Sequence, residues 1–558
     1  MLHSAAASHN LACMGKQEFA PELDFRTHPD QYRHLRLEIE GPVAWIRLDV
    51  KQDGGILDHY DLKLNSYDMS VDIELADATM RLRFEHPEVT CVVITSAQEG
   101  IFCSGANIFM LGTSSHAFKV NFCKFTNETR LHIEDATEHS GQTYIAALNG
   151  IASGGGYELP LACKEIYLVD DRRSAVALPE VPYLGVLPGT GGLTRVVDKR
   201  KVRRDRADYF CTLAEGIKGK RAQQWGLVDA VWPTSVFMEK VTARAREIAG
   251  MGRPDRKGVT LDPLGVEVSE QGLEYTHVTL KFGSDHTASL EIRGPAEIPD
   301  VPSDPAKLGC GWWPLQAFRE LDDCLLRMRF NYPEISLVLI RTKGTLASVL
   351  QIDSQLMEHK DHWFINEVIH HAKRVVKRLD VTSKTFFALV EKDSCFGGSL
   401  LEVALAADRI YMLEEEGVEI ALSGMNAGPM PKGNGLTRLG TRFLHQPGYA
   451  EEIGQNRDHL GAEEAEEKGL VTFIADDIDW DDEIRLGAEE RASFSPDALT
   501  AMEANLRFAG PETMETKIFG RLSAWQNWIF QRPNAVGEKG ALTLYGRPES
   551  PEFDRRRT

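Results

Sequence analysis

The sequence predicts an α/β protein built from two related domains in tandem, with a helical C-terminal region. Period-two or continuous β-branched runs alternate with amphipathic helical patterns, which is typical of strands alternating with helices. Segments of the first half recur in the same order in the second half. The chain has 558 residues, more than one ordinary hydrophobic core accommodates.

The elements of the first half follow from their hydrophobic periods. Residues 34–50 alternate apolar and polar side chains and predict strands, and residues 70–84 have the period of an amphipathic helix. Residues 89–95 form a continuous β-branched run, which indicates a strand buried on both faces. Residues 143–148 repeat that signal before a glycine-rich stretch and another helical pattern. This order predicts layered sheets and helices.

The internal repeat relates four segments of the two halves. The matches begin at Met80 and Leu326, Thr143 and Thr385, Tyr157 and Leu401, and Gly189 and Gly433. Glu158 falls opposite Glu402, but Gly155 falls opposite Ser399 and Glu180 opposite Gly424. The second copy therefore reads as a degenerate, noncatalytic domain that serves assembly or lid formation; a repurposed binding site is the alternative.

Composition shifts place the domain boundaries. We expect a disordered tail at 1–25, a catalytic domain at 26–255, a degenerate copy at 256–490 and a helical region at 491–558. A Gly/Pro/charge-rich segment beginning at Met251 joins the two copies.

Charge and cysteine usage indicate a cytoplasmic protein. The net charge of −20 argues against nucleic acid as the main partner. No apolar stretch reaches the length of a membrane span, and the N-terminus lacks a signal-peptide pattern. Nine cysteines without CxxC spacing indicate reduced thiols and give no support to a metal site. The basic run 195–206 is either a solvated helix face or a positive field for a phosphate-bearing ligand.

Three segments of the first half suggest chemistry: Phe102–Ile108, Asn149–Glu158 and Leu178–Gly192. Glycines that open a helix leave N–H groups free to bind negative charge. Two such groups can stabilise an oxyanion, and two carboxylates can supply acid and base. Each signal is weak alone, since a glycine triplet is usually a packing feature and Cys103 alone usually a small buried side chain. Their joint order gives them weight.

That order, written FCSGANI, GGGYE and PEVPYLGVLPGTGG, resembles the crotonase (enoyl-CoA hydratase/isomerase) superfamily, whose fold is shared with ClpP. The resemblance implies an acyl-CoA substrate, Glu158 and Glu180 as catalytic acids, and the N–H groups of Ala106 and Gly155 as the oxyanion hole. It places the substrate and coenzyme A contacts in two loops, at Lys63, Asn65, Cys103 and Asn107. Asn107 departs from the family's usual aspartate, which we expect to change loop hydrogen bonding more than chemistry.

Among members of this family, the chain resembles those that open an epoxidised aromatic ring. The resemblance implies conversion of 2,3-epoxybenzoyl-CoA and two waters to 3,4-didehydroadipyl-CoA semialdehyde and formate, in aerobic benzoate degradation. No metal or cofactor is implied beyond the coenzyme A of the substrate, and a homodimer or other homo-oligomer is expected. An insertion at 114–141 is either a surface excursion or a wall of the ring pocket, through Phe122, Phe125, Asn127 or Arg130.

Two other functions stay open at this stage. One is an enoyl-CoA hydratase or isomerase of broader specificity, and the other is a noncatalytic acyl-CoA-binding scaffold. A peptidase is disfavoured because the loops offer no serine–histidine arrangement.

Overall fold

The computed structural model describes residues 21–558, which divide into two compact units, one ending at Gly258 and the other beginning at Val259. The tail expected at 1–25 falls mainly outside the described residues. Its last residues are packed on the first unit, because Leu23 is buried and the Phe25 ring lies 5.6 Å from that of Phe125. The packed chain therefore begins earlier than the expected residue 26.

The first unit is built on a six-stranded sheet of order β1-β2-β3-β5-β7-β10. The first pair is antiparallel and the other four pairs are parallel. Every residue of β3 is buried, as expected for its continuous apolar run. The strands are β1 (Leu35–Glu40), β2 (Val43–Leu48), β3 (Cys91–Ser96), β5 (Thr143–Leu148), β7 (Glu165–Asp170) and β10 (Ala230–Pro233).

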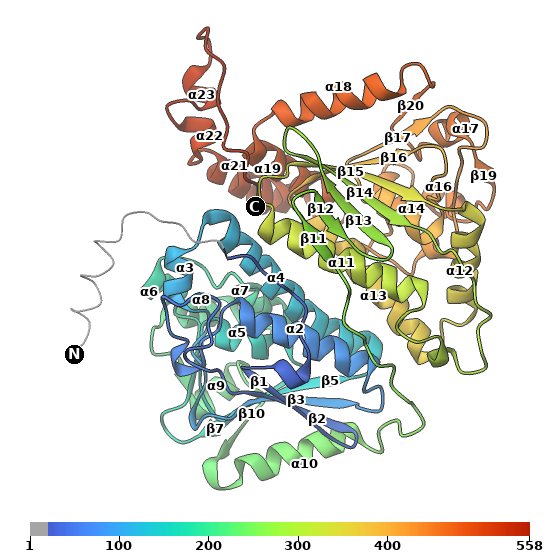
Figure 1. The fold of residues 1–558 in the computed structure, drawn as a ribbon. Coiled ribbons are helices and arrows are strands. Elements are labelled where there is room, and N and C mark those ends of the chain that lie inside the picture. Colours follow the sequence, from blue (N-terminus) through green and yellow to red (C-terminus); the bar gives the residue numbers. More distant parts are fainter. Residues whose placement is uncertain (1–20) are drawn as a thin grey trace. The chain divides into compact units, whose positions relative to one another are not determined.

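Helices cover both faces of this sheet, with α10 on one face and α2 on the other (Figure 1). Trp45, Val93 and Ile145 are register neighbours on the α10 face, where they pack with Val241 and Ala245. The helices are α2 (Met69–Phe84), α3 (Ile108–Thr113), α4 (His116–Asp135), α5 (Gly155–Ala162), α6 (Glu180–Leu184), α7 (Gly192–Thr194), α8 (Arg204–Thr212), α9 (Gly219–Gln224) and α10 (Phe237–Ala249).

A smaller sheet of order β4-β6-β8-β9 carries the loops that sequence analysis singled out. Its strands are β4 (Gly100–Cys103), β6 (Gly150–Ser153), β8 (Ala175–Ala177) and β9 (Ile217–Lys218). The parallel strands β4 and β6 end inside the first two motif segments, and β8 ends directly before the third. Because parallel strands bring their carboxyl ends to one edge of a sheet, the three segments meet there.

The second unit repeats the strand order and sense of the first. In its eight-stranded sheet, β13 and β14 are antiparallel, and β14, β15, β16, β17 and β20 follow in parallel, as β1 and β2 are followed by β3, β5, β7 and β10. The strands are β11 (Glu267–Ser269), β12 (Gly272–Glu274), β13 (Val278–Phe282), β14 (Thr287–Arg293), β15 (Leu337–Lys343), β16 (Thr385–Val390), β17 (Arg409–Leu413) and β20 (Phe473–Ala475). A two-stranded pair, β18 (Ile420–Ala421) and β19 (His459–Leu460), stands where the first unit has its four-stranded second sheet.

Helices α18 and α11 lie on opposite sides of the large sheet of the second unit (Figure 1). Its helices are α11 (Trp313–Asn331), α12 (Leu346–Glu358), α13 (Trp363–Val381), α14 (Gly398–Leu405), α15 (Arg438–Arg442), α16 (Pro447–Ile453), α17 (Ala462–Glu467), α18 (Trp480–Ser493), α19 (Pro496–Arg507), α20 (Met514–Lys517), α21 (Ser523–Ile529), α22 (Pro533–Val536) and α23 (Ala541–Leu544).

The boundary expected at residue 491 falls inside α18. The break is at Ser495, whose side chain caps α19, with Pro496 in the first turn. The C-terminal helices belong to the second unit: Arg557 is buried, pairs with Glu503 at 2.6 Å and donates its backbone N–H to Pro333 O. They therefore extend the second unit and do not form a separate domain.

None of the helices described between residues 21 and 558 is long and apolar enough to cross a membrane. The eight cysteines within this range are all unpaired.

Candidate active site

The glycine triplet is required by the close approach of three segments. Gly154 has φ +57° and ψ −133°, which side chains disfavour, and it links β6 to the first residue of α5. A methyl group on Gly155 would lie 2.0 Å from the Tyr67 hydroxyl oxygen, and one on Gly156 would lie 2.2 Å from the Cys103 carbonyl oxygen. Any side chain at these two positions would push β4 and Tyr67 away from α5.

The structure brings Ala106 and Gly155 to the same place. Tyr67 donates its N–H to Gly105 O at 3.0 Å and accepts from Asn107 N at 2.8 Å, so its backbone holds the two peptides on either side of Ala106. A methyl group on Gly105 would lie 3.0 Å from Gly155 N. Neither the Ala106 N–H nor the Gly155 N–H donates a hydrogen bond to any residue in the described range. Two free donors therefore stand side by side.

Glu158, in the first turn of α5, is buried and held through both carboxylate oxygens. Oε1 accepts from Gly192 N at 2.7 Å, and Oε2 accepts from the Thr190 hydroxyl. A methyl group on Gly192 would lie 2.7 Å from that carboxylate, so only glycine fits there. Burial raises the pKa of Glu158, while the Thr190 and Gly192 hydrogen bonds and the charge of Arg130 act in the opposite direction.

Glu180 is the first residue of α6 and is only 8% exposed. Its Oε2 is buried and has no hydrogen-bond partner among the described residues. Its Oε1 lies 3.0 Å from the position that a methyl group on Gly154 would take. Burial first, and the charge of Glu158 second, raise the pKa of Glu180 to about 7. The two carboxylates thus share one site, with one fixed by hydrogen bonds and the other free.

Helix α4, which forms most of the insertion, fastens the loop that holds Glu158. Asn127 Nδ2 donates to Gly189 O at 3.0 Å, and Arg195 makes a two-pronged ion pair with Glu134, both bonds at 2.9 Å. The insertion is therefore more than a surface excursion, because it anchors both ends of the loop that contains Thr190.

The ring-pocket candidates on α4 have different surroundings. Phe122 lies 6.0 Å from the Tyr67 ring, whereas Phe125 packs against Phe25. Arg130 is buried, forms an ion pair with Asp72 at 2.7 Å and lies over the Tyr67 ring. Of these candidates, Phe122 lies next to the Tyr67 ring and Asn127 next to the loop at Gly189, and neither side chain forms a buried ion pair as Arg130 does.

The residues expected to contact coenzyme A do not form one group. Lys63 is exposed and close to Asp61, with an N–O distance of 3.4 Å. Asn65 is buried, and its amide is used internally: Oδ1 accepts from Val50 N, and Nδ2 donates to Ser96 Oγ at 2.8 Å and to Phe102 O. The Asn65 side chain thus joins β2, β3 and β4 and holds this loop in place, and its contact with coenzyme A stays a prediction.

Cys103 and Asn107 likewise shape the oxyanion loop. The Cys103 thiol is buried and donates to Asn65 O at 3.0 Å, and burial raises its pKa to about 12, which disfavours a thiolate. Asn107 caps α3 by accepting from Met110 N at 2.9 Å and donates to Asp61 O at 2.8 Å. The aspartate-to-asparagine departure thus adds a donor bond to the neighbouring loop.

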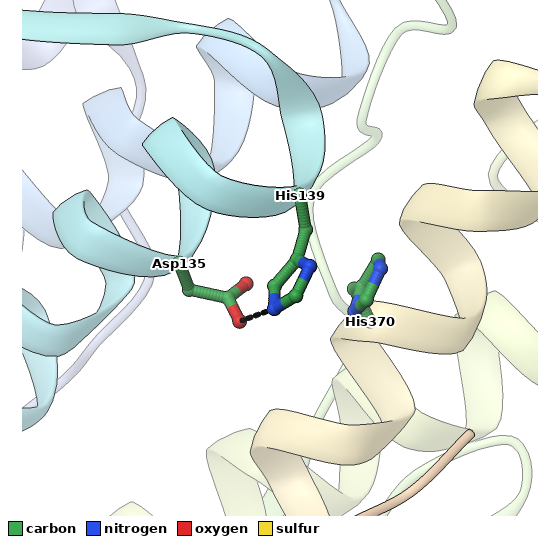
Figure 2. Close-up of side chains that lie close together, drawn as sticks. All are labelled: Asp135, His139 and His370. Carbon is green, nitrogen blue, oxygen red and sulfur yellow. Dashed lines mark ion pairs between the residues drawn. The ribbon is translucent and has the colours of Figure 1, made fainter. Parts of the chain in front are cut away.

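An acid–histidine pair lies at the end of α4, outside this site. His139 Nε2 is 3.8 Å from Asp135 Oδ1 (Figure 2). The other Asp135 oxygen is engaged by Arg83 at 2.8 Å. The Arg83 guanidinium and the His139 ring therefore share the Asp135 carboxylate.

Part of the basic run 195–206 is paired with neighbouring acids. Arg195 and Lys199 both pair with Glu134, and Arg200 pairs with Asp229 at 3.0 Å. These pairs support the structural interpretation of the run over a positive field for a ligand.

Comparisons with known proteins agree with the geometry. The enoyl-CoA hydratase/isomerase family model matches residues 61–261. A benzoyl-CoA-dihydrodiol lyase from Aromatoleum evansii is 52% identical over 551 residues, covering 98% of this chain and 99% of that protein. The chain belongs to the crotonase (enoyl-CoA hydratase/isomerase) family. Among solved structures, an enoyl-CoA hydratase from Geobacillus kaustophilus is 33% identical, with 40% of this chain and 76% of that one covered and a TM-score of 0.35. One from Bacillus anthracis is 27% identical, with 39% and 76% covered and a TM-score of 0.33.

Membership of the crotonase family accounts for the three motif loops but does not identify every residue around them. Thr190 stands inside a quoted motif, Arg195 follows that motif by three residues, and Tyr67 follows the expected contact residue Asn65 by two. Their roles nevertheless depend on partners far along the chain, such as Glu134 and Gly155. Only the weak signal of their position next to a motif was available in the sequence.

Proposed function

We propose that the protein catalyses ring opening of 2,3-epoxybenzoyl-CoA with two waters, giving 3,4-didehydroadipyl-CoA semialdehyde and formate, in aerobic benzoate degradation. The observation that carries the proposal is the pair of buried glutamates beside two free N–H groups. The aromatic substrate is supported by the full-length similarity to a benzoyl-CoA-dihydrodiol lyase.

The free N–H groups of Ala106 and Gly155 receive the thioester carbonyl oxygen in this proposal. Hydrogen bonds at this oxygen draw electron density out of the attached ring, so that the neighbouring ring carbons become easier to attack. Preorganised donors of this kind stabilise developing negative charge most strongly in a site that excludes water.

The surroundings of the two glutamates favour different roles. Glu180 has a pKa of about 7 and an unpaired oxygen, so it can hold a proton near neutral pH and donate it to the epoxide oxygen. Burial raises the pKa of Glu158, which makes its carboxylate a stronger base, while the two hydrogen bonds that it accepts favour the ionised form; Glu158 acts as the base that takes a proton from water. Once Glu180 has lost its proton, it serves as a base in the later carbon–carbon cleavage. These steps are hydrolytic, and no cofactor beyond the substrate's coenzyme A enters them.

Substrate binding divides between the exposed and buried parts of the site. The Lys63 ammonium group is exposed and available to a phosphate of coenzyme A, while Asn65, Cys103 and Asn107 shape the loops beside it. We assign Phe122 and Asn127 on α4 to the side of the site that receives the aromatic ring.

The test is formate release from the purified protein given 2,3-epoxybenzoyl-CoA, with crotonyl-CoA hydration measured in parallel. We expect formate with little hydration. Hydration without formate would replace the proposal with a broader enoyl-CoA hydratase, and binding of both thioesters without turnover would indicate a scaffold. The Glu158→Gln, Glu180→Gln double variant is the matched control, because it should still bind the substrate and release no formate.

We further infer a cytoplasmic homo-oligomer, most simply a homodimer. The eight unpaired cysteines in the described range support a reducing compartment. Large apolar side chains of the C-terminal helices are exposed, including Met514, Phe519 and Phe530, which supports burial against another copy. Light scattering of the full chain in solution measures the number of copies, and a monomer would contradict this inference.

A further inference from the structure

We propose that the Tyr67 hydroxyl is a third hydrogen-bond donor to the substrate's thioester oxygen, beside the N–H groups of Ala106 and Gly155. This assignment rests on the proposed function and adds to it a residue that acts on the substrate directly.

The position of Tyr67 is fixed from both sides of the oxyanion loop. Its backbone is hydrogen-bonded to Gly105 and Asn107, which flank Ala106. Its side chain then reaches Gly155, because a methyl group on Gly155 would lie 2.0 Å from the hydroxyl oxygen. The same residue therefore positions one N–H donor and directs its hydroxyl toward the peptide that supplies the other.

The hydroxyl has no partner of its own. Tyr67 is 4% exposed, and its hydroxyl oxygen is buried without a hydrogen bond to any described residue. By contrast, the hydroxyl of Tyr60 donates to Asp68 at 2.5 Å and that of Tyr157 to Leu227 O at 2.6 Å. Native structures pair nearly all buried polar groups, and an unpaired one next to two free N–H groups points to a ligand that completes it.

The surroundings keep this hydroxyl a donor. Burial raises the pKa of Tyr67 well above its usual range, so the phenol stays protonated at any working pH. The Arg130 guanidinium lies 5.4 Å from the ring centroid, and its positive charge makes the phenol a stronger donor. Asp72 holds that arginine at 2.7 Å, so the charge is fixed before substrate binds.

A third donor suits an oxygen that changes from carbonyl to enolate. A carbonyl oxygen offers two lone pairs, whereas an enolate oxygen carries more negative charge and attracts a further donor more strongly. No covalent bond to Tyr67 forms and its proton stays on the phenol, so the hydroxyl favours the charged state without entering the proton balance of the reaction.

The test compares Tyr67→Phe with the wild type, using benzoyl-CoA carrying a ¹³C carbonyl as an unreactive probe. Difference infrared spectroscopy measures the carbonyl stretching frequency of the bound thioester, which falls as hydrogen bonds to the oxygen become stronger. We expect the wild type to lower this frequency and Tyr67→Phe to return it part of the way toward the free value. With 2,3-epoxybenzoyl-CoA, we expect kcat to fall roughly 10²-fold, as for loss of one oxyanion donor, with the pH profile unchanged.

Tyr157→Phe is the matched control, since it removes a hydroxyl that is bonded inside the protein. It should lower stability while leaving the carbonyl frequency and kcat unchanged, whereas Tyr67→Phe should leave stability unchanged.

If the wild type releases formate but Tyr67→Phe shows the same carbonyl frequency as the wild type, the assignment of Tyr67 is overturned and the proposed reaction is not. Absence of formate release by the wild type would refute the proposed reaction, while the frequency comparison would still test Tyr67. An unshifted frequency in the wild type would refute the oxyanion site and Tyr67's role together.

Discussion

Glu158 in α5 and Glu402 in α14 occupy matching places in the two halves, each in a helix that follows a strand of a parallel sheet, but their partners differ. Glu158 accepts from a backbone N–H and a hydroxyl, both neutral. Glu402 accepts from Asn426 at 2.8 Å and forms an ion pair with Arg438 at 3.2 Å. A carboxylate fixed by neutral donors can still exchange a proton with substrate, whereas one neutralised by a buried arginine serves structure.

The arginine itself is common to both halves. Arg195 and Arg438 end the matching sequences GTGGLTR and GNGLTR, and each pairs with an acid in the last turn of a long helix, Glu134 in α4 and Asp380 in α13. Only in the second half does the arginine also reach the helix glutamate. The second half thus has the ion pair that secures the loop, but there the same arginine also contacts the helix glutamate.

The helix N-termini differ in the same sense. In the first half the Gly155 N–H is free, but in the second half the Ser399 N–H donates to Asp353 Oδ2 at 2.8 Å, and the Ser423 hydroxyl donates to the same oxygen at 2.7 Å. A methyl group on Gly398 would lie 1.7 Å from that oxygen, so the carboxylate is packed directly on the helix end. An internal carboxylate fills the place where the first half leaves room for an oxyanion.

The largest expected effect separates the two glutamates. Glu158→Gln should lower ring-opening kcat by about 10³-fold, as for loss of a general base. Glu402→Gln should leave kcat nearly unchanged and lower the free energy of unfolding by about 1–3 kcal/mol, because Arg438 loses a charged partner. Formate assays and urea unfolding of both variants measure this, and loss of activity in a folded Glu402→Gln protein would show that the second half is not degenerate.

The second largest expected effect concerns Glu180, which corresponds to Gly424 in the second half of the repeat. Turnover that needs protonated Glu180 should fall as pH rises through about 7, and Glu180→Gln should abolish that limb. Because the folded pKa is raised above the usual value of 4.5, the native state binds more protons than the unfolded chain between those values, so stability falls as pH rises through this window. Glu180→Gln should therefore increase the free energy of unfolding at pH 8 by roughly 2 kcal/mol, and by less at pH 5.

The control for this prediction is Glu99→Gln, which alters an exposed acid of the same unit. Its effect on unfolding should be small at both pH values. An equal response of the two variants to pH would contradict the proposed environment of Glu180.

The smallest expected effect concerns Asp353, whose carboxylate is packed against the N-terminus of α14 in the second half. Asp353→Ala leaves the Ser399 N–H and the Ser423 hydroxyl without their acceptor and should cost about 1–3 kcal/mol of stability, with kcat unchanged. Asp353→Asn keeps an acceptor oxygen and should cost less. Thermal unfolding of the two variants makes the comparison, and a drop in kcat without a loss of stability would assign the second half a part in turnover.

Much of this architecture was predictable because it depends on local patterns. The strands at 34–50, 89–95 and 143–148 and the helix at 70–84 are confirmed, since hydrophobic period reports which face of an element is buried. The helical region was expected from residue 491, whereas α18 ends at Ser493 and α19 begins at Pro496, and both helices belong to the second unit.

The sequence by itself determined the family and the repeat and pointed to Glu158 and Glu180, because these features are short motifs of glycines and acids at fixed spacing. Only the tertiary structure decided what surrounds them. The Asn65 amide forms internal hydrogen bonds, one Glu180 oxygen has no partner among the described residues, and the Tyr67 hydroxyl lies next to Gly155. Each of these features depends on side chains that the fold brings together from distant strands and helices. A pKa or an unpaired donor is set by burial and by such neighbours, and neither is a property of any short stretch of sequence.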